Sequence, residues 1–128
     1  MPWPQHFPEN CPPSESQPAD GVFYRYVNKN TITARDFVSH LERNLAQSYD
    51  DICIAAGLSV YKDINDAKRL AQRVPAFRKK KLAKGNLTPE MGNSLPTPSQ
   101  TAKSHHTWWL SIGSEPWTVF QVLEVPED

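Results

Sequence analysis

The stretch from residue 57 to residue 74, GLSVYKDINDAKRLAQRV, constrains the fold more than any other part of this 128-residue chain. Gly57 opens a short apolar segment, residues 58–61, which has the aromatic and β-branched residues typical of a strand. Small and apolar residues then recur at helical spacing up to Pro75, which ends a helix: Ala67, Leu70, Ala71 and Val74. The stretch therefore predicts a strand, a polar turn and an amphipathic helix.

The composition fits one soluble domain. The length is that of a single core, and the mean hydropathy is −0.60. No apolar run approaches the roughly 20 residues that span a bilayer, and the N-terminus lacks the basic and apolar parts of a secretory signal. We therefore expect a cytoplasmic protein with no membrane contact. In a reducing compartment Cys11 and Cys53 are expected as a free thiol and a small buried residue, with a disulfide as the less favoured alternative.

The first 20 residues carry six of the twelve prolines. Proline lacks the amide donor that helices and sheet interiors require, so residues 1–20 are predicted to form an extended leader. Trp3 and Phe7 offer a means of docking this leader, and a detached arm is the alternative. The single domain is then expected to span residues 21–125.

Residues 22–27, VFYRYV, have the composition of a strand. Alternation places Arg25 on the same side as Phe23 and Val27, where an unpaired charge would be costly. A guanidinium in such a place binds either a carboxylate, for which Glu124 is a candidate, or an anionic ligand. Arg25 is therefore the most informative single residue of the chain.

The remaining segments complete an α+β expectation. Thr33 and Asp36 have the spacing of a capping box, and apolar residues up to Leu45 continue a helical stripe. Residues 52–56 fit either a helical turn or a strand. Residues 77–84 contain a possible strand, residues 88–103 read as a long polar loop, and residues 105–110 and 117–125 read as a terminal β-hairpin. We expect one twisted, mainly antiparallel sheet with two principal helices.

Charge is distributed unevenly although the formal net charge is zero. Residues 62–84 contain nine Lys and Arg against two Asp, which gives +7. The densest part of this face is predicted to bind nucleic acid or an acidic protein partner: Arg78, Lys79, Lys80, Lys81 and Lys84. The alternative interpretation is a solubilising strand edge, which discourages aggregation.

The histidine pair is the other conspicuous polar feature. In a strand His105 and His106 point to opposite faces, so only one of them can enter a given pocket. A zinc site needs three or four ligands at suitable spacing, and no such motif is present in the sequence, so no metal is expected. A histidine hydrogen-bonded beside the Trp108 and Trp109 pair is the alternative to one that faces a substrate.

The order of these segments resembles that of small ADP-ribosyltransferase-like domains. The resemblance rests on Tyr24-Arg25-Tyr26 in an early strand, on Gly57-Leu58-Ser59-Val60-Tyr61 before an Ala-rich helix, and on late strands with His and Glu. Separately, DFVSH, GLSVY and HHTWW are similar to the DFLS, GxSV and HxTxW patterns of small uncharacterised bacterial proteins. That second resemblance covers most of residues 21–125 and implies no function.

The first resemblance implies an NAD site. It assigns Arg25 to the NAD phosphates, Ser59 and Tyr61 to the surroundings of the nicotinamide, and Glu124 to the ribose. His106 is expected in the same cleft, and Glu124 and His106 are the candidate catalytic residues. The sequence departs from the family's pattern, because the Ser-Thr-Ser motif is reduced to one Ser and no Glu-x-Glu or Gln-x-Glu loop is present.

Overall fold

The computed structural model describes residues 3–123, which form a single antiparallel sheet of seven strands. Across the sheet the order of the strands is β1-β5-β6-β3-β2-β4-β7. Their bounds are β1 Gln17–Pro18, β2 Gly21–Val27, β3 Leu58–Tyr61, β4 Lys81–Leu87, β5 Gly92–Pro96, β6 His105–Leu110 and β7 Gln121–Val122. The expectation of an α+β fold with one mainly antiparallel sheet is confirmed.

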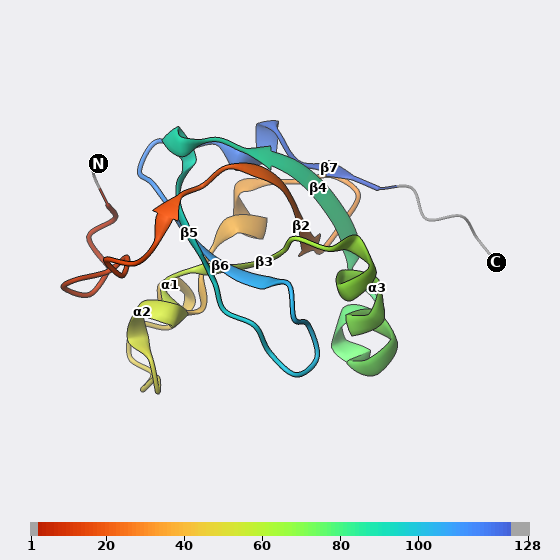
Figure 1. The fold of residues 1–128 in the computed structure, drawn as a ribbon, viewed down its shortest axis with the longest axis horizontal. Helices are drawn as coiled ribbons and strands as arrows, with labels where there is room; N and C mark the ends of the chain where they lie inside the picture. Colours follow the sequence, from red (N-terminus) through yellow and green to blue (C-terminus); the bar gives the residue numbers. More distant parts are fainter. Residues whose placement is uncertain (1–2, 124–128) are drawn as a thin grey trace.

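Three α-helices border this sheet, α1 His40–Arg43, α2 Ile52–Ala55 and α3 Ile64–Arg73. Helices α1 and α2 lie together at one end of the molecule and α3 lies at the other (Figure 1). Four short 3-10 turns complete the elements: η1 Ala34–Phe37, η2 Pro75–Phe77, η3 Pro89–Met91 and η4 Pro116–Thr118.

The main core lies on one face of the sheet, against strands β2, β4 and β6. Phe23 and Val27 of β2 are buried there with Trp108 of β6. The chain after β6 returns through η4 and lays Phe120 on Trp108, with ring centroids 6.0 Å apart. Gly85 of β4 permits this approach, because a Cβ at that position would meet the Phe120 ring at 2.6 Å.

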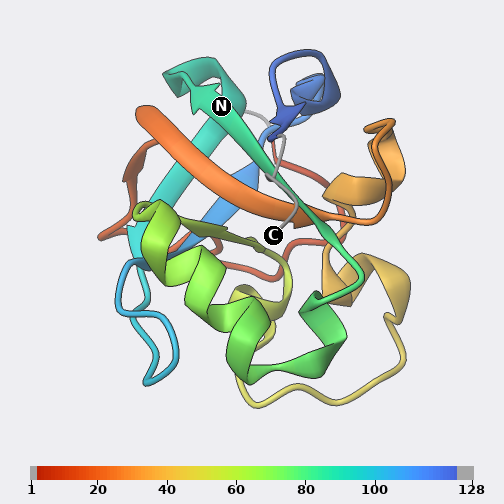
Figure 2. The ribbon, with the colours of Figure 1, turned by 90° about the vertical axis from the view of Figure 1, so that its right-hand side faces the viewer.

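Helix α3, which the sequence predicts, covers the opposite face of the sheet. Ala67 and Leu70 are buried against Tyr61 of β3 and Leu82 of β4. Asp63 caps the helix by accepting a hydrogen bond from the amide of Asn65, and the helix ends immediately before Val74 and Pro75. Figure 2 looks onto α3 and shows β2 and β4 curving over the other strands.

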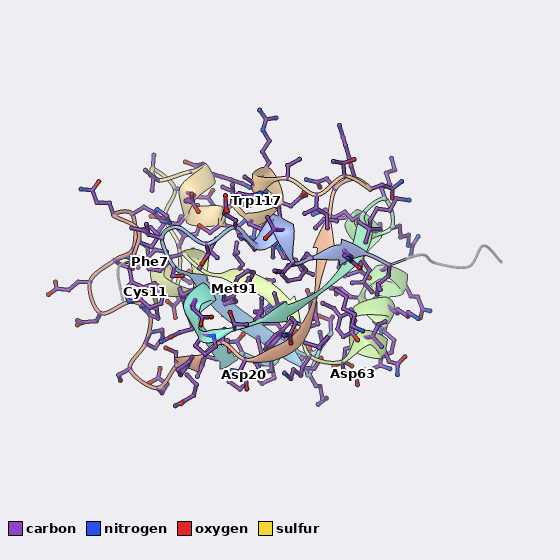
Figure 3. The ribbon with its side chains drawn as sticks, turned by 90° about the horizontal axis from the view of Figure 1, so that it is seen from above. Phe7, Cys11, Asp20, Asp63, Met91 and Trp117 are labelled. Carbon is purple, nitrogen blue, oxygen red and sulfur yellow. A yellow bond between two sulfur atoms is a disulfide. The ribbon has the colours of Figure 1, made fainter. Side chains whose placement is uncertain are left out.

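The N-terminal segment lies against the body of the domain. Its strand β1 pairs with β5, and Ala19 is completely buried. Cys11 forms a disulfide with Cys53 of α2, with the two Cα atoms 5.6 Å apart. Phe7 and Cys11 lie at the same end of the molecule, far from Asp63 (Figure 3). The expectation of two unbonded cysteines is therefore wrong, because the fold brings together two residues 42 positions apart.

One predicted helix is divided. The segment 33–45 contains η1 and α1, separated by Val38 and Ser39 in extended conformations. Ser39 caps α1 by accepting a hydrogen bond from the amide of Glu42, while the Asp36 carboxylate accepts from the amides of Thr33 and Asn28. Two local caps thus compete with one continuous helix. Residues 52–55, left open from the sequence, are helical.

Strand pairing also differs from the expectation in the C-terminal half. Residues 88–103, predicted as a loop, contain β5, which forms a hairpin with β6. The predicted hairpin of residues 105–110 with 117–125 is wrong, because β7 pairs with β4 on the far side of the sheet. Local sequence favours strands here, but the partner of each strand is decided by long-range packing such as that of Phe120 on Trp108. Among the described residues, no helix has the length and apolarity to cross a bilayer.

Candidate functional site

The two edges of strand β2 are paired very differently. On one side all seven residues, Gly21–Val27, pair with β4. On the other side the only pair with β3 joins Tyr24 to Tyr61. Beyond that pair β2 and β3 separate, and we call this gap the open seam and the β2–β4 ladder the closed seam. The open seam is an interruption in the middle of the sheet.

Arg25 fills the start of the open seam. Its Nη1 donates to the carbonyl oxygen of Ser59 on β3 at 2.7 Å, and its Nε donates to the carbonyl oxygen of Asp36 at 3.0 Å. The guanidinium also lies 5.7 Å from the centre of the Phe37 ring. The side chain thus replaces strand-to-strand hydrogen bonds and holds a positive charge inside the sheet.

A cavity of about 170 Å³ occupies the open seam. Two further cations, Arg43 of α1 and Lys80 before β4, line it together with Arg25. Hydroxyl and imidazole groups of Ser39, His40, Ser59 and Tyr61 also line it, as do Tyr26, Asn28 and Asp36. Among residues 3–123 no carboxylate oxygen lies within 4.0 Å of any of the three cationic groups. The Asp36 carboxylate, the nearest acidic group of the lining, is bonded to the amides of Asn28 and Thr33.

The electrostatics reflect this crowding of positive charge. Burial lowers the pKa of Arg25 to about 10, and Tyr61 and Asp36 oppose that shift while Arg43 adds to it. Burial also lowers the pKa of Lys80, and repulsion from Arg25 and Arg43 lowers it further. With a pKa of about 10, Arg25 remains charged at neutral pH. An anion in the cavity would therefore offset the desolvation penalty of these cations and reduce their mutual repulsion.

Ser59 and Arg25 both line the cavity, although their side chains leave opposite faces of the sheet. The Ser59 hydroxyl lies 2.9 Å from Nε2 of His105, on the face that carries Tyr61. Arg25 alternates along β2 with Phe23 and Val27, which face the main core. The separation of β2 from β3 is what brings both residues to one cavity.

Two wider hollows, both lined by His105, adjoin this cavity, and a third of about 560 Å³ shares Asn28 and Asp36 with it. A hollow of about 430 Å³ shares His40, Gly57, Leu58 and Ser59 with it. A hollow of about 550 Å³ shares Tyr61 and Phe77 with the cavity and His105 with the first hollow. A further hollow of about 740 Å³ lies beside β7 and borders the end of the described residues, and none of the three cations lines it.

The structure gathers some of the predicted site residues and disperses others. Arg25, Ser59, Tyr61 and Lys80 line the cavity. His106 does not: its ring packs on Phe23, with centroids 5.3 Å apart, and its Nδ1 donates to the carbonyl oxygen of Ser104. Strand alternation places His105 on the face that carries Ser59 and Tyr61, where it lines the two adjoining hollows of about 430 and 550 Å³. Glu124 lies outside the described residues.

The basic run does not form one surface. Arg78 donates to the carbonyl oxygens of Ala71 and Gln72 near the end of α3, so it stabilises the helix terminus. Lys80 belongs to the cavity. All five residues are exposed, and the remaining three, Lys79, Lys81 and Lys84, do not line the cavity. Nucleic-acid or acidic-partner binding by this run stays a prediction.

Sequence reasoning missed Arg43 and His40. Both are exposed residues of a four-residue helix, and nothing in the local pattern distinguishes them from ordinary surface residues. His105 was recognised only as one of a pair. The alternation that separates His105 from His106 was the available signal, but it could not say which face carries the cavity.

Among residues 3–123 no three His, Cys, Asp or Glu side chains are grouped so as to hold a metal ion. No family model, curated protein or solved structure matches the chain. The functional argument therefore depends on the geometry and charge of the open seam.

Proposed function

We propose that the protein binds a phosphate-bearing ligand of the nucleotide class, with the phosphate group in the cavity of the open seam. One observation carries this proposal: Arg25, Arg43 and Lys80 line one cavity, and no described carboxylate lies within 4.0 Å of them. Guanidinium and ammonium groups are the usual partners of phosphate in proteins.

The size of the cavity limits which part of the ligand it holds. A volume of about 170 Å³ lies below the roughly 300–1,000 Å³ of ordinary ligand pockets, so it suits a phosphate or pyrophosphate group and not a whole dinucleotide. Of the adjoining hollows of about 430 and 550 Å³, the second supplies room for a nucleoside part. Tyr61 and Phe77 line the second of them and offer aromatic surfaces.

NAD is the ligand to test first, because the resemblance described above assigns Arg25 to its phosphates. The proposal concerns binding. It derives no ADP-ribosyl transfer, since Glu124, the residue expected to orient the ribose, lies outside the described residues.

Isothermal titration calorimetry with NAD and with inorganic pyrophosphate tests the proposal. Wild-type protein is expected to bind both, and Arg25→Met should weaken binding by about tenfold or more, as expected for loss of a charge-assisted hydrogen bond. Arg73→Met is the matched control, because Arg73 is an exposed cation of α3 outside the cavity. Absence of binding, or equal weakening by both substitutions, would overturn the proposal.

A further inference from the structure

Ser59 and His105 form a hydrogen-bonded pair at the junction of the cavity with both hollows. The Ser59 hydroxyl oxygen lies 2.9 Å from Nε2 of His105, and the two residues come from neighbouring strands, β3 and β6. Ser59 is exposed, so its hydroxyl is open to a ligand. This is the distance at which a base can remove the proton of a serine nucleophile.

The other ring nitrogen fixes the role of the imidazole. Nδ1 of His105 lies 2.9 Å from the carbonyl oxygen of Thr97 and 2.8 Å from the Thr97 hydroxyl. A carbonyl oxygen can only accept, so Nδ1 carries the proton in the neutral ring. Nε2 is then the acceptor, and the Ser59 hydroxyl donates to it. Burial lowers the pKa of His105, which keeps the imidazole neutral at pH 7.

The arrangement has the three parts of an activated nucleophile: a hydroxyl, a base within reach, and a third group that orients the base. Tyr61 adds a second constraint on the ring, since it packs edge-on against His105 with centroids 5.4 Å apart.

We propose that Ser59 is a nucleophile, with His105 as its general base, and that it cleaves esters joining an apolar acyl group to a phosphorylated alcohol. The substrate class rests on the proposed function, because the phosphate is assigned to Arg25, Arg43 and Lys80. The acyl group is assigned to the hollow of about 430 Å³, where Ile54, Ala55 and Leu58 supply apolar surface.

The reaction balances with water as the only co-reactant. Ser59 Oγ bonds to the carbonyl carbon while its proton passes to Nε2 of His105. The carbon–oxygen bond to the alcohol then breaks, and the alcohol leaves with the proton from His105. Water then attacks the acyl-serine while its proton passes to His105; the bond from the acyl carbon to Ser59 Oγ breaks, and Ser59 Oγ takes that proton back from His105 as the acid leaves.

Covalent labelling with an alkyl fluorophosphonate tests this assignment on the full chain. The expected product is a single adduct at Ser59, identified by mass spectrometry of peptides, with fluoride as the leaving group. Ser59→Ala should abolish the adduct, and His105→Gln should slow labelling by about 100-fold or more, the size of a general-base contribution. Circular dichroism and thermal unfolding verify that both variants are folded.

Ser114→Ala is the matched control, because Ser114 bonds to Ser111 and to the carbonyl oxygen of Glu90 and to no histidine. Labelling at Ser114 or another residue, or equal rates in wild-type and folded His105→Gln protein, would overturn the nucleophile. Pyrophosphate is expected to slow labelling of Ser59. NAD binding without labelling would overturn this inference and leave the proposed function standing, whereas labelling that pyrophosphate does not slow would overturn the assigned substrate class.

Discussion

Strand β2 pairs to very different extents with its two neighbouring strands. Its closed seam with β4 is paired along Gly21–Val27, whereas its open seam with β3 holds one pair and then a charged cavity. The closed seam is backed by the aromatic core of Phe23, Trp108 and Phe120. One strand thus separates stability from recognition: one edge completes the sheet, and at the other the Arg25 side chain donates to the Ser59 carbonyl oxygen.

The largest effect on the free energy of unfolding is expected from a substitution in the core behind the closed seam. Phe120→Ala removes a ring packed against Trp108 and Phe37, with centroid distances of 6.0 and 5.3 Å. We expect a loss of about 3–5 kcal/mol in the free energy of unfolding, measured by urea denaturation. Affinity for pyrophosphate, measured below the unfolding transition, should change by less than about threefold. A variant that keeps its stability, or that loses affinity while folded, would contradict the separation of the two seams.

The disulfide is expected to have the next largest effect. It closes a loop over a sequence separation of 42 and joins the N-terminal segment to α2. Cys11→Ser with Cys53→Ser should lower the free energy of unfolding by about 2–4 kcal/mol, because the unfolded chain regains freedom. Denaturation with and without a reducing agent provides the same comparison in the wild type. Unchanged stability in both experiments would show that the disulfide does not stabilise the fold.

The disulfide also bears on location. Such bonds persist in oxidising compartments and are rare in the cytosol, so the bond weighs against the cytoplasmic location expected from the sequence.

A smaller effect is expected in the pH dependence of the free energy of unfolding, and it comes from His105 beside the open seam. Burial lowers the pKa of His105 in the folded protein, whereas the unfolded chain takes up a proton near pH 6.5. Stability should therefore fall as the pH drops below about 6.5, because the unfolded state binds the extra proton. His105→Gln should show a shallower fall than the wild type when melting temperatures are compared between pH 7.5 and about 5. Identical slopes would show that the imidazole is not desolvated as described.

Much of the regular structure follows from local patterns. The strands at 21–27, 58–61 and 105–110 and the helix ending before Pro75 were predictable, because period, propensity and capping agree there. Strand β5 was not, since GNSLP lacks apolar alternation and is held by pairing with β1 and β6. The disulfide and the position of β7 depend on long-range packing, which no local pattern contains.

The candidate site was predictable to a similar extent. Arg25 is distinguished by its charge within an apolar strand, and the structure places it in the lining of the charged cavity. His106 was the expected catalytic histidine, but it is His105 that bonds Ser59, and this depends on which face of β6 lies beside the Ser59 side chain. Arg43 comes from a helix whose short length resulted from a cap at Ser39, so its place was not encoded in any periodicity.

The central claim is that the open seam, and not the closed seam or the basic surface, receives a phosphate group. Titration of ¹⁵N-labelled protein with pyrophosphate, followed by two-dimensional NMR, tests it most directly. The account predicts concentration-dependent shifts of the Arg25 side-chain Nε–H and of the amides of Tyr26, Ser59 and Lys80, with Ala83 and Gly85 of the closed seam unmoved. Shifts confined to Lys79, Lys81 and Lys84, or no shifts at all, would contradict it.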